Sequence, residues 1–182
     1  MKLARELLND ALSLARAMGP VSLRTLVNVA VYDGYTVLAT TRIRQAARRW
    51  HVPFVNRALR LAQMAIYNIE IAKDAELGEG VYFMHTMGTV IGGDAQIGAR
   101  TILLGSITIG NLNNRGYPRI GEDVIIGAGA RIMGPISIGA GALIGANAVV
   151  TTDVPAGATA VGVPAVIRVK KANGGDPARS YE

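Results

Sequence analysis

The stretch VIIGAGARIMGPISIGAGALIGANAVV, residues 124–150, decides the fold, because an aliphatic position recurs in it every six residues. A six-residue period is a multiple of the two-residue period of a β-strand and not of the 3.6-residue period of a helix. Each unit is therefore expected to form a short strand followed by a turn. Three units would close one coil, and successive coils would stack their strands in parallel.

The same period extends over residues 71–155 and predicts a little over four coils. The composition agrees, because 50% of the residues are hydrophobic but only 5% are aromatic, and 22 are glycine. The predicted fold class is an all-β solenoid, a parallel β-helix whose core is built from branched aliphatics. The residues expected in that core are Ile71, Leu77, Ile91, Ile97, Leu103, Ile109, Ile120, Ile126, Ile132, Ile138, Ile144 and Val150.

The period is interrupted twice. The step from Phe83 to Ile91 is eight residues and the step from Ile109 to Ile120 is eleven, so two and five residues should be extruded as loops. Insertions in a solenoid map to surface loops, where functional residues tend to gather. The first interruption contains MHTMGT (84–89), and the second contains NLNNRGYP (111–118).

The segment before the repeat has the apolar spacing of amphipathic helices. A helix is expected over residues 3–18, a second from about Ser22 to Gly34, a third over 35–50 and a fourth over 53–68. The predicted domains are a helical cap (1–68), the β-helix (69–170) and a flexible C-terminal tail (171–182).

Several classes of protein are excluded by what the sequence lacks. It contains no cysteine, which rules out disulfides, thiolate metal sites and a thiol nucleophile. The N-terminus has no uninterrupted apolar centre, as a signal peptide would, and no stretch of about 18 uncharged apolar residues occurs. A cytoplasmic protein is therefore expected. The net charge of +6 suggests an anionic partner.

The hexad run resembles the left-handed β-helix of hexapeptide-repeat acyltransferases, over residues 65–170. Within them it is similar to the serine acetyltransferase branch and to the O-acetyltransferases of exopolysaccharide and capsule (colanic acid type) biosynthesis. The resemblance implies a left-handed coil, a homotrimer and acetyl-CoA as co-substrate. No metal is expected, because the two histidines of the chain cannot build the three-histidine zinc site of the carbonic anhydrases that share this solenoid.

His85 is the candidate general base. MHTMG (84–88) resembles the DHxTG motif of serine acetyltransferases, with Met84 in place of the aspartate. A near-neutral imidazole suits removal of a proton from an attacking hydroxyl. Glu70 matches the carboxylate that orients this histidine in the family; the alternatives are a histidine without a task and a solvated glutamate. His51 is interpreted as structural or solvent-facing.

The acceptor side departs from the serine acetyltransferase pattern. Tyr117 replaces a second histidine before proline, Gly116 replaces an arginine, Arg115 is displaced by one position, and an aspartate-proline-alanine stretch is missing. These departures, together with the short chain, favour a sugar hydroxyl in polysaccharide biosynthesis as the acceptor. The alternatives are serine, in cysteine biosynthesis, and a non-catalytic binding scaffold. The predicted substrate-binding residues are Asn111, Asn113, Asn114, Arg115 and Tyr117.

Acetyl-CoA is expected along the later coils. Small residues would let pantetheine reach main-chain groups, although the same residues also suit the turns of any such solenoid. Basic residues near the C-terminus would meet the nucleotide phosphates, unless they form only a soluble basic strand. The predicted cofactor-binding residues are Gly127, Ala128, Gly145, Ala146, Arg168, Lys170 and Lys171.

Six arginines lie between residues 42 and 60, on the third and fourth expected helices. They form either a solvated face of the cap or a basic surface that contacts an anionic membrane. The membrane interpretation predicts peripheral attachment at the inner face of the cytoplasmic membrane. No recognition helix or aromatic-interleaved basic motif supports nucleic acid as a partner. The arginines are Arg42, Arg44, Arg48, Arg49, Arg57 and Arg60.

Overall fold

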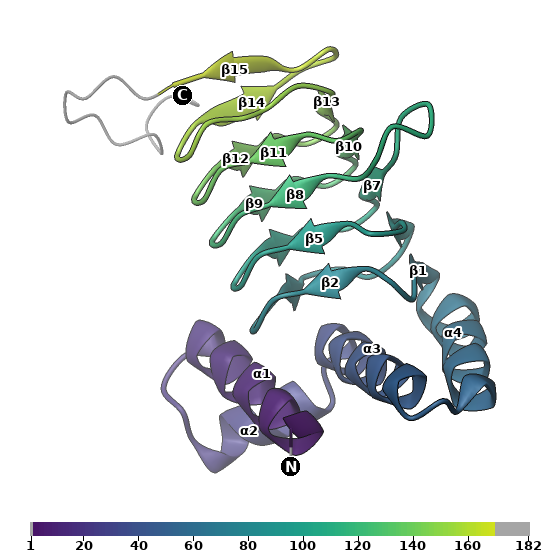
Figure 1. Cartoon of the computed structure of the whole chain (residues 1–182). Coiled ribbons are helices and arrows are strands. Elements are labelled where there is room, and N and C mark those ends of the chain that lie inside the picture. Colours follow the sequence, from purple (N-terminus) through teal and green to yellow (C-terminus); the bar gives the residue numbers. More distant parts are fainter. Residues whose placement is uncertain (1, 170–182) are drawn as a thin grey trace.

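In the computed structural model, which describes residues 2–169, four helices cover one end of a column of short strands (Figure 1). The helices are α1 (Lys2–Met18), α2 (Leu23–Ala30), α3 (Asp33–Arg49) and α4 (Pro53–Tyr67). The strands are β1 (Ile69–Ile71), β2 (Glu76–Leu77), β3 (Tyr82–Phe83), β4 (Thr89–Ile91), β5 (Gln96–Ile97), β6 (Ile102–Leu103), β7 (Thr108–Gly110), β8 (Arg119–Ile120), β9 (Ile125–Ile126), β10 (Arg131–Met133), β11 (Ser137–Ile138), β12 (Leu143–Ile144), β13 (Val149–Val150), β14 (Thr159–Val161) and β15 (Val166–Arg168).

The strands form three sheets along the sides of the column. One has the order β1-β4-β7-β10-β13, the second β2-β5-β8-β11 and the third β3-β6-β9-β12-β14-β15. All neighbours pair in parallel except β14 and β15, which are antiparallel. The predicted parallel solenoid is confirmed. Its first side has five strands, β1 to β13, which span four full coils, and the chain continues beyond them to β14, as expected for a little over four coils.

The strand register confirms both interruptions of the period. Ile71 pairs with Ile91, 20 residues further along, and Ile91 pairs with Ile109, 18 residues further along. Ile109 then pairs with Ile132 after 23 residues, and Ile132 pairs with Val150 after 18. The first and third coils are therefore two and five residues longer than the 18-residue repeat, as the sequence predicts.

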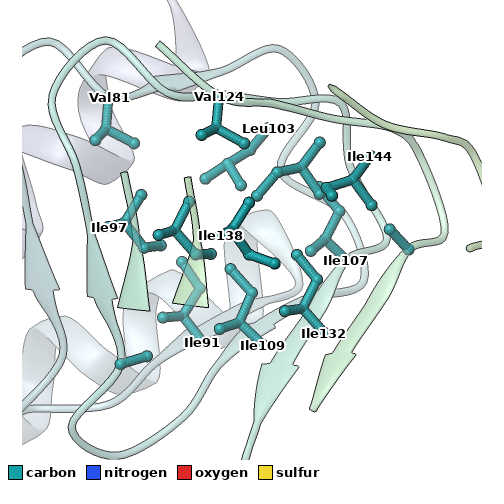
Figure 2. Close-up of a cluster of buried hydrophobic side chains, with 14 of the residues drawn as sticks. Val81, Ile91, Ile97, Leu103, Ile107, Ile109, Val124, Ile132, Ile138 and Ile144 are labelled. Carbon is teal, nitrogen blue, oxygen red and sulfur yellow. The ribbon is translucent and has the colours of Figure 1, made fainter. Parts of the chain in front are cut away.

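The core is a stack of aliphatic side chains inside the column. All twelve residues predicted to point inward are at most 6% exposed. Ile91, Ile109 and Ile132 follow one another along the axis, one from each successive coil (Figure 2). Full burial of one such side chain contributes about 1.5–3 kcal/mol, so the repeat stabilises the fold at every coil.

Two helices differ slightly from prediction. Ser22 caps α2, but α2 ends at Ala30, and α3 begins at Asp33 rather than at Tyr35. Gly34 therefore lies inside α3 instead of ending the preceding helix. A Cβ at Gly34 would lie 2.2 Å from the carbonyl oxygen of Phe83, so the helix needs a glycine where it meets β3. α4 ends at Tyr67 and β1 begins at Ile69, on either side of Asn68.

Helix α3 supplies hydrogen-bond donors to the open edge of the β-helix. β1 and β2 are the end strands of their sheets, so their outer edges have no strand partner. Arg42 donates to the carbonyls of Leu77 (2.6 Å) and Gly78 (2.7 Å), and Arg44 donates to that of Ile71 (2.9 Å). These two arginines are buried, so their role is to hold the cap on the first coil.

The pairing of the arginines bears on the predicted membrane surface. Arg42 is paired with the buried Asp10 (3.0 Å), and three further arginines contact carboxylates. Membrane attachment stays a prediction. The ion pairs leave fewer unpaired arginines to contact anionic lipid, whereas the apolar side chains of Trp50, Phe54 and Ile66 are exposed. Within residues 2–169 no helix is both long and apolar enough to cross a membrane. The three further pairs are Arg48–Asp74, Arg49–Glu6 and Arg60–Glu70.

Candidate active site

His85 lies on a short loop, residues 84–88, where the chain passes from β3 in the six-stranded sheet to β4 in the five-stranded sheet. Its side chain is exposed. The backbone on both sides is tied down, since Met84 N donates to Leu103 O (2.9 Å) and Gly88 N donates to Asn68 O (2.9 Å). The loop is therefore an anchored platform that presents an imidazole to solvent.

A glycine in the next coil makes room for this histidine. Gly105 has a φ of +107°, and a Cβ placed on it would lie 2.9 Å from the Cβ of His85. Any larger residue would combine backbone strain with a close contact. Gly105 is a residue that the sequence reasoning did not single out.

Tyr32, immediately before α3, holds the other side of the loop. Its hydroxyl shares its single proton between the carbonyl oxygens of Phe83 (2.8 Å) and Met84 (2.7 Å). Burial of the phenol raises the pKa of Tyr32, and the hydrogen-bond and Coulomb interactions with Tyr82 raise it further. The hydroxyl therefore keeps its proton and remains a donor. The sequence carries no signal for this contact, because its two acceptors are 51 and 52 residues away.

Glu70, the predicted orienting carboxylate, lies on β1 and forms an ion pair with Arg60 of α4. It pairs in register with Val90, five positions after His85. Among the residues that the structure describes, no hydrogen bond joins Glu70 to His85. Arg60 and Glu70 instead line a cavity of about 480 Å³ between α4 and the first coil. The role of Glu70 stays a prediction.

Four of the predicted cofactor residues lie on the same corner of the column as His85. Gly127 and Ala128 follow β9, and Gly145 and Ala146 follow β12, just as His85 follows β3. Hydrogen bonds connect this series of turns, from Ser106 N to Met87 O, Gly129 N to Gly105 O and Asn147 N to Ala128 O. We call residues 84–88, 104–106, 127–129 and 145–147 the histidine corner.

Packing also requires Gly127 and Gly145, two of the glycines of the histidine corner. A Cβ on Gly127 would lie 2.4 Å from the nitrogen of Ala146, and one on Gly145 would lie 2.7 Å from Val161. The side chains of Ala128 and Ala146 are exposed, so small residues line the surface that extends from His85. Arg168 is exposed on β15. Lys170 and Lys171 lie outside the described residues.

The second loop is organised around Tyr117. Asn111 Nδ2 donates to the Tyr117 hydroxyl oxygen (3.3 Å), and the half-buried ring covers Gly93, where a Cβ would lie 2.0 Å from the ring. Asn113 and Asn114 adopt left-handed conformations at the tip, and Arg115 is exposed. A cleft of about 460 Å³ lies beside Tyr117. Its lining includes the polar residues Asp94, Gln96, Arg119 and Ser137 and the apolar Pro135 and Ile136.

The two loops leave the column at different corners. The His85 loop enters the five-stranded sheet, whereas residues 111–118 leave it, between β7 and β8. A single chain thus places the two loops at opposite ends of the strands of one sheet, the histidine loop before β4 and the second loop after β7. His51, in the turn after α3, is exposed and contributes to neither loop.

Comparison with known proteins identifies the class. A family profile, "Bacterial transferase hexapeptide (six repeats)", matches residues 117–152. The chain is 37% identical over 138 residues to the serine acetyltransferase of Helicobacter pylori strain J99, covering 74% of this chain and 81% of the relative. Soybean serine acetyltransferase apoenzyme superposes with a TM-score of 0.80 at 35% identity, over 91% of this chain and 69% of that chain. Neisseria gonorrhoeae serine acetyltransferase in complex with serine gives a TM-score of 0.81 at 28% identity, over 92% and 69%.

A capped β-helix of hexapeptide units with an inserted histidine loop defines a hexapeptide-repeat transferase. Within that class, the chain belongs to the serine acetyltransferase family. It is an O-acetyltransferase, and its solenoid has the left-handed sense of these relatives. The predicted fold class and enzyme class are confirmed.

The predicted sugar acceptor in polysaccharide biosynthesis is wrong. The relatives and the solved structures are serine acetyltransferases. The length argument fails because 138 aligned residues make up 81% of the Helicobacter pylori enzyme but only 74% of this chain, so that enzyme is the shorter of the two. The differences at Gly116 and Tyr117 therefore do not identify another acceptor by themselves.

Proposed function

We propose that the protein is a serine O-acetyltransferase that transfers the acetyl group of acetyl-CoA to the hydroxyl of L-serine, the reaction that supplies cysteine biosynthesis. The observation that carries the proposal is the similarity to the Helicobacter pylori enzyme across most of both chains. The exposed His85 on its anchored loop supports it, because the reaction needs a base that an incoming alcohol can reach.

His85 acts as the general base. The neutral imidazole accepts the proton of the serine hydroxyl as the oxygen attacks the carbonyl carbon of the thioester. The carbon–oxygen bond forms, the carbon–sulfur bond breaks, and the proton held by the imidazole passes to the departing CoA thiolate. The products are O-acetylserine and CoA, and His85 returns to its neutral form.

Acetyl-CoA lies along the histidine corner. The small, exposed side chains of Ala128 and Ala146 support this placement, because they leave space beside the turns for the narrow pantetheine arm. Arg168 is a cation for the nucleotide phosphates. The predicted Lys170 and Lys171 would extend this charge along the chain.

The protein is a homotrimer in which the second loop of one chain completes the site at His85 of its neighbour. The separation of the two loops within one chain supports this assembly. Exposed apolar side chains also flank them, namely Met87 and Val90 beside His85 and Leu112 in the second loop. Burial of such side chains at a subunit interface is favourable. Residues of the second loop, Tyr117 and Asn111 among them, would then contact serine.

The proposal is tested by following CoA release from acetyl-CoA with L-serine, and by identifying O-acetylserine by mass spectrometry. Glycine, which lacks a hydroxyl, and L-homoserine, which has one methylene more, are the matched controls. We expect L-serine to be the preferred acceptor of the three. CoA release with L-serine that does not exceed hydrolysis without an acceptor would refute the proposal.

A further inference from the structure

We infer that Tyr32 is a positioning residue for His85, acting from the helical cap through the backbone of the 84–88 loop. The inference rests on the proposed role of His85 as the base. Among the described residues, no hydrogen bond joins Tyr32 to the imidazole, and its hydroxyl bonds only to backbone carbonyls. It fixes the peptide from which the histidine projects.

The need for such a contact arises from the strand that leads to the histidine. β3 is the end strand of its sheet and pairs only with β6, so its outer edge has no strand partner. The Tyr32 hydroxyl reaches this edge and donates to the Phe83 and Met84 carbonyls. The Met84 carbonyl belongs to the peptide bond that joins Met84 to His85. Its hydrogen bond therefore restricts rotation of the peptide plane immediately before the histidine.

The cap is shaped to bring Tyr32 to this point. Gly34 lets the start of α3 lie against the Phe83 carbonyl, where any Cβ would clash at 2.2 Å. The Tyr32 ring packs on Tyr82 of β3, with ring centroids 5.6 Å apart and planes tilted by 35°. The close approach at Gly34 thus brings the start of α3 to β3, and the contact with Tyr82 orients the ring, so the hydroxyl is directed at the two carbonyls.

The chain contains a matched control three residues further along, within α3. The Tyr35 hydroxyl donates to the carbonyl oxygen of Leu7 (3.2 Å), so it joins α3 to α1, and among the described residues it makes no hydrogen bond to the loop. Both tyrosines are half-buried. Tyr32→Phe and Tyr35→Phe each remove one hydroxyl, and only the first removes a hydrogen bond beside His85.

The first measurement is steady-state kinetics of serine acetylation. We expect Tyr32→Phe to lower kcat by about 10- to 100-fold, because a small displacement of a catalytic group has effects of this size. KM for acetyl-CoA should stay within about twofold, and Tyr35→Phe should match the wild type. In a His85→Ala background, Tyr32→Phe should have almost no further effect, since the base it positions is gone. Equal losses for Tyr32→Phe with and without His85, or equal losses in the two tyrosine variants, would overturn the inference.

The second measurement does not depend on activity. The chain has only two histidines, so imidazole NMR signals are assigned with His85→Ala and His51→Ala. Tyr32→Phe should shift or broaden the His85 signals and leave those of His51 unchanged, and Tyr35→Phe should change neither. Unchanged His85 signals would refute the positioning role. If the wild type fails to acetylate serine, the proposed function falls, while this comparison still decides whether Tyr32 holds the loop.

Discussion

His85 is an exposed side chain on a loop that is anchored from both sides, so its imidazole can be removed without disturbing the core. We predict that His85→Ala lowers kcat for serine acetylation by about 10²- to 10⁴-fold, the usual contribution of a general base. The melting temperature should stay close to that of the wild type. His51→Ala, which removes the other exposed histidine, is the control and should retain full activity. A loss below about tenfold in His85→Ala would contradict the assignment.

Gly34 offers a residue-scale test in which two physical effects have opposite signs. Helix propensity alone predicts that Gly34→Ala stabilises α3, by up to about 1 kcal/mol. Contact with the Phe83 carbonyl predicts the reverse, because the new Cβ would lie 2.2 Å from a backbone atom. We expect the contact to dominate, with a loss of about 1–3 kcal/mol in the free energy of unfolding. Urea denaturation measures it, and a variant more stable than the wild type would show that the helix does not approach β3 so closely.

At the scale of elements, α3 closes the open edge of the solenoid. Arg42→Met removes the donor to two carbonyls at the end of β2 and leaves Asp10, which is fully buried, without its cation. We predict a loss of about 3–5 kcal/mol in the free energy of unfolding, typical of a broken buried ion pair.

The matched control for this prediction is Arg48→Met, which removes an arginine of the same helix from its exposed pair with Asp74. Exposed pairs contribute about 0–1 kcal/mol, so this variant should unfold almost as the wild type does. Thermal and urea unfolding of the two variants side by side give the comparison. Similar losses for both would mean that Arg42 is not the buried edge donor that the structure places there.

At the scale of the whole molecule, the separation of the two loops predicts that activity requires assembly. Light scattering should give a mass of three chains. His85→Ala and Tyr117→Ala, each impaired alone, should recover activity when they are unfolded together and refolded as mixed trimers. About a quarter of the sites would then combine an intact His85 from one chain with an intact Tyr117 from another. No recovery in mixed trimers would mean that each chain builds its site alone.

The six-residue period by itself determined the solenoid, its core and the position of its insertions. Every predicted core aliphatic is buried, and the 20- and 23-residue coils reproduce the two interruptions. This succeeds because strand period and inward packing are local properties of a repeat. The same local signal placed His85 in an inserted loop, and its resemblance to a known motif pointed to a base. The acceptor was misjudged, because single replacements at Gly116 and Tyr117 do not show what the assembled pocket binds.

Only the tertiary structure decided how the cap serves the solenoid. Tyr32 lies 51 and 52 positions before the carbonyls it binds, and Arg42 lies 35 and 36 positions before its own. Nothing periodic connects a helix to a strand edge. The sequence therefore suggested that the six arginines form a solvated face or a membrane-contacting surface, whereas Arg42 and Arg44 are buried donors. The common corner of His85, Ala128 and Ala146 likewise depends on how many residues each coil contains. The sequence thus specifies each coil through local burial, whereas the site depends on contacts between segments far apart in the chain.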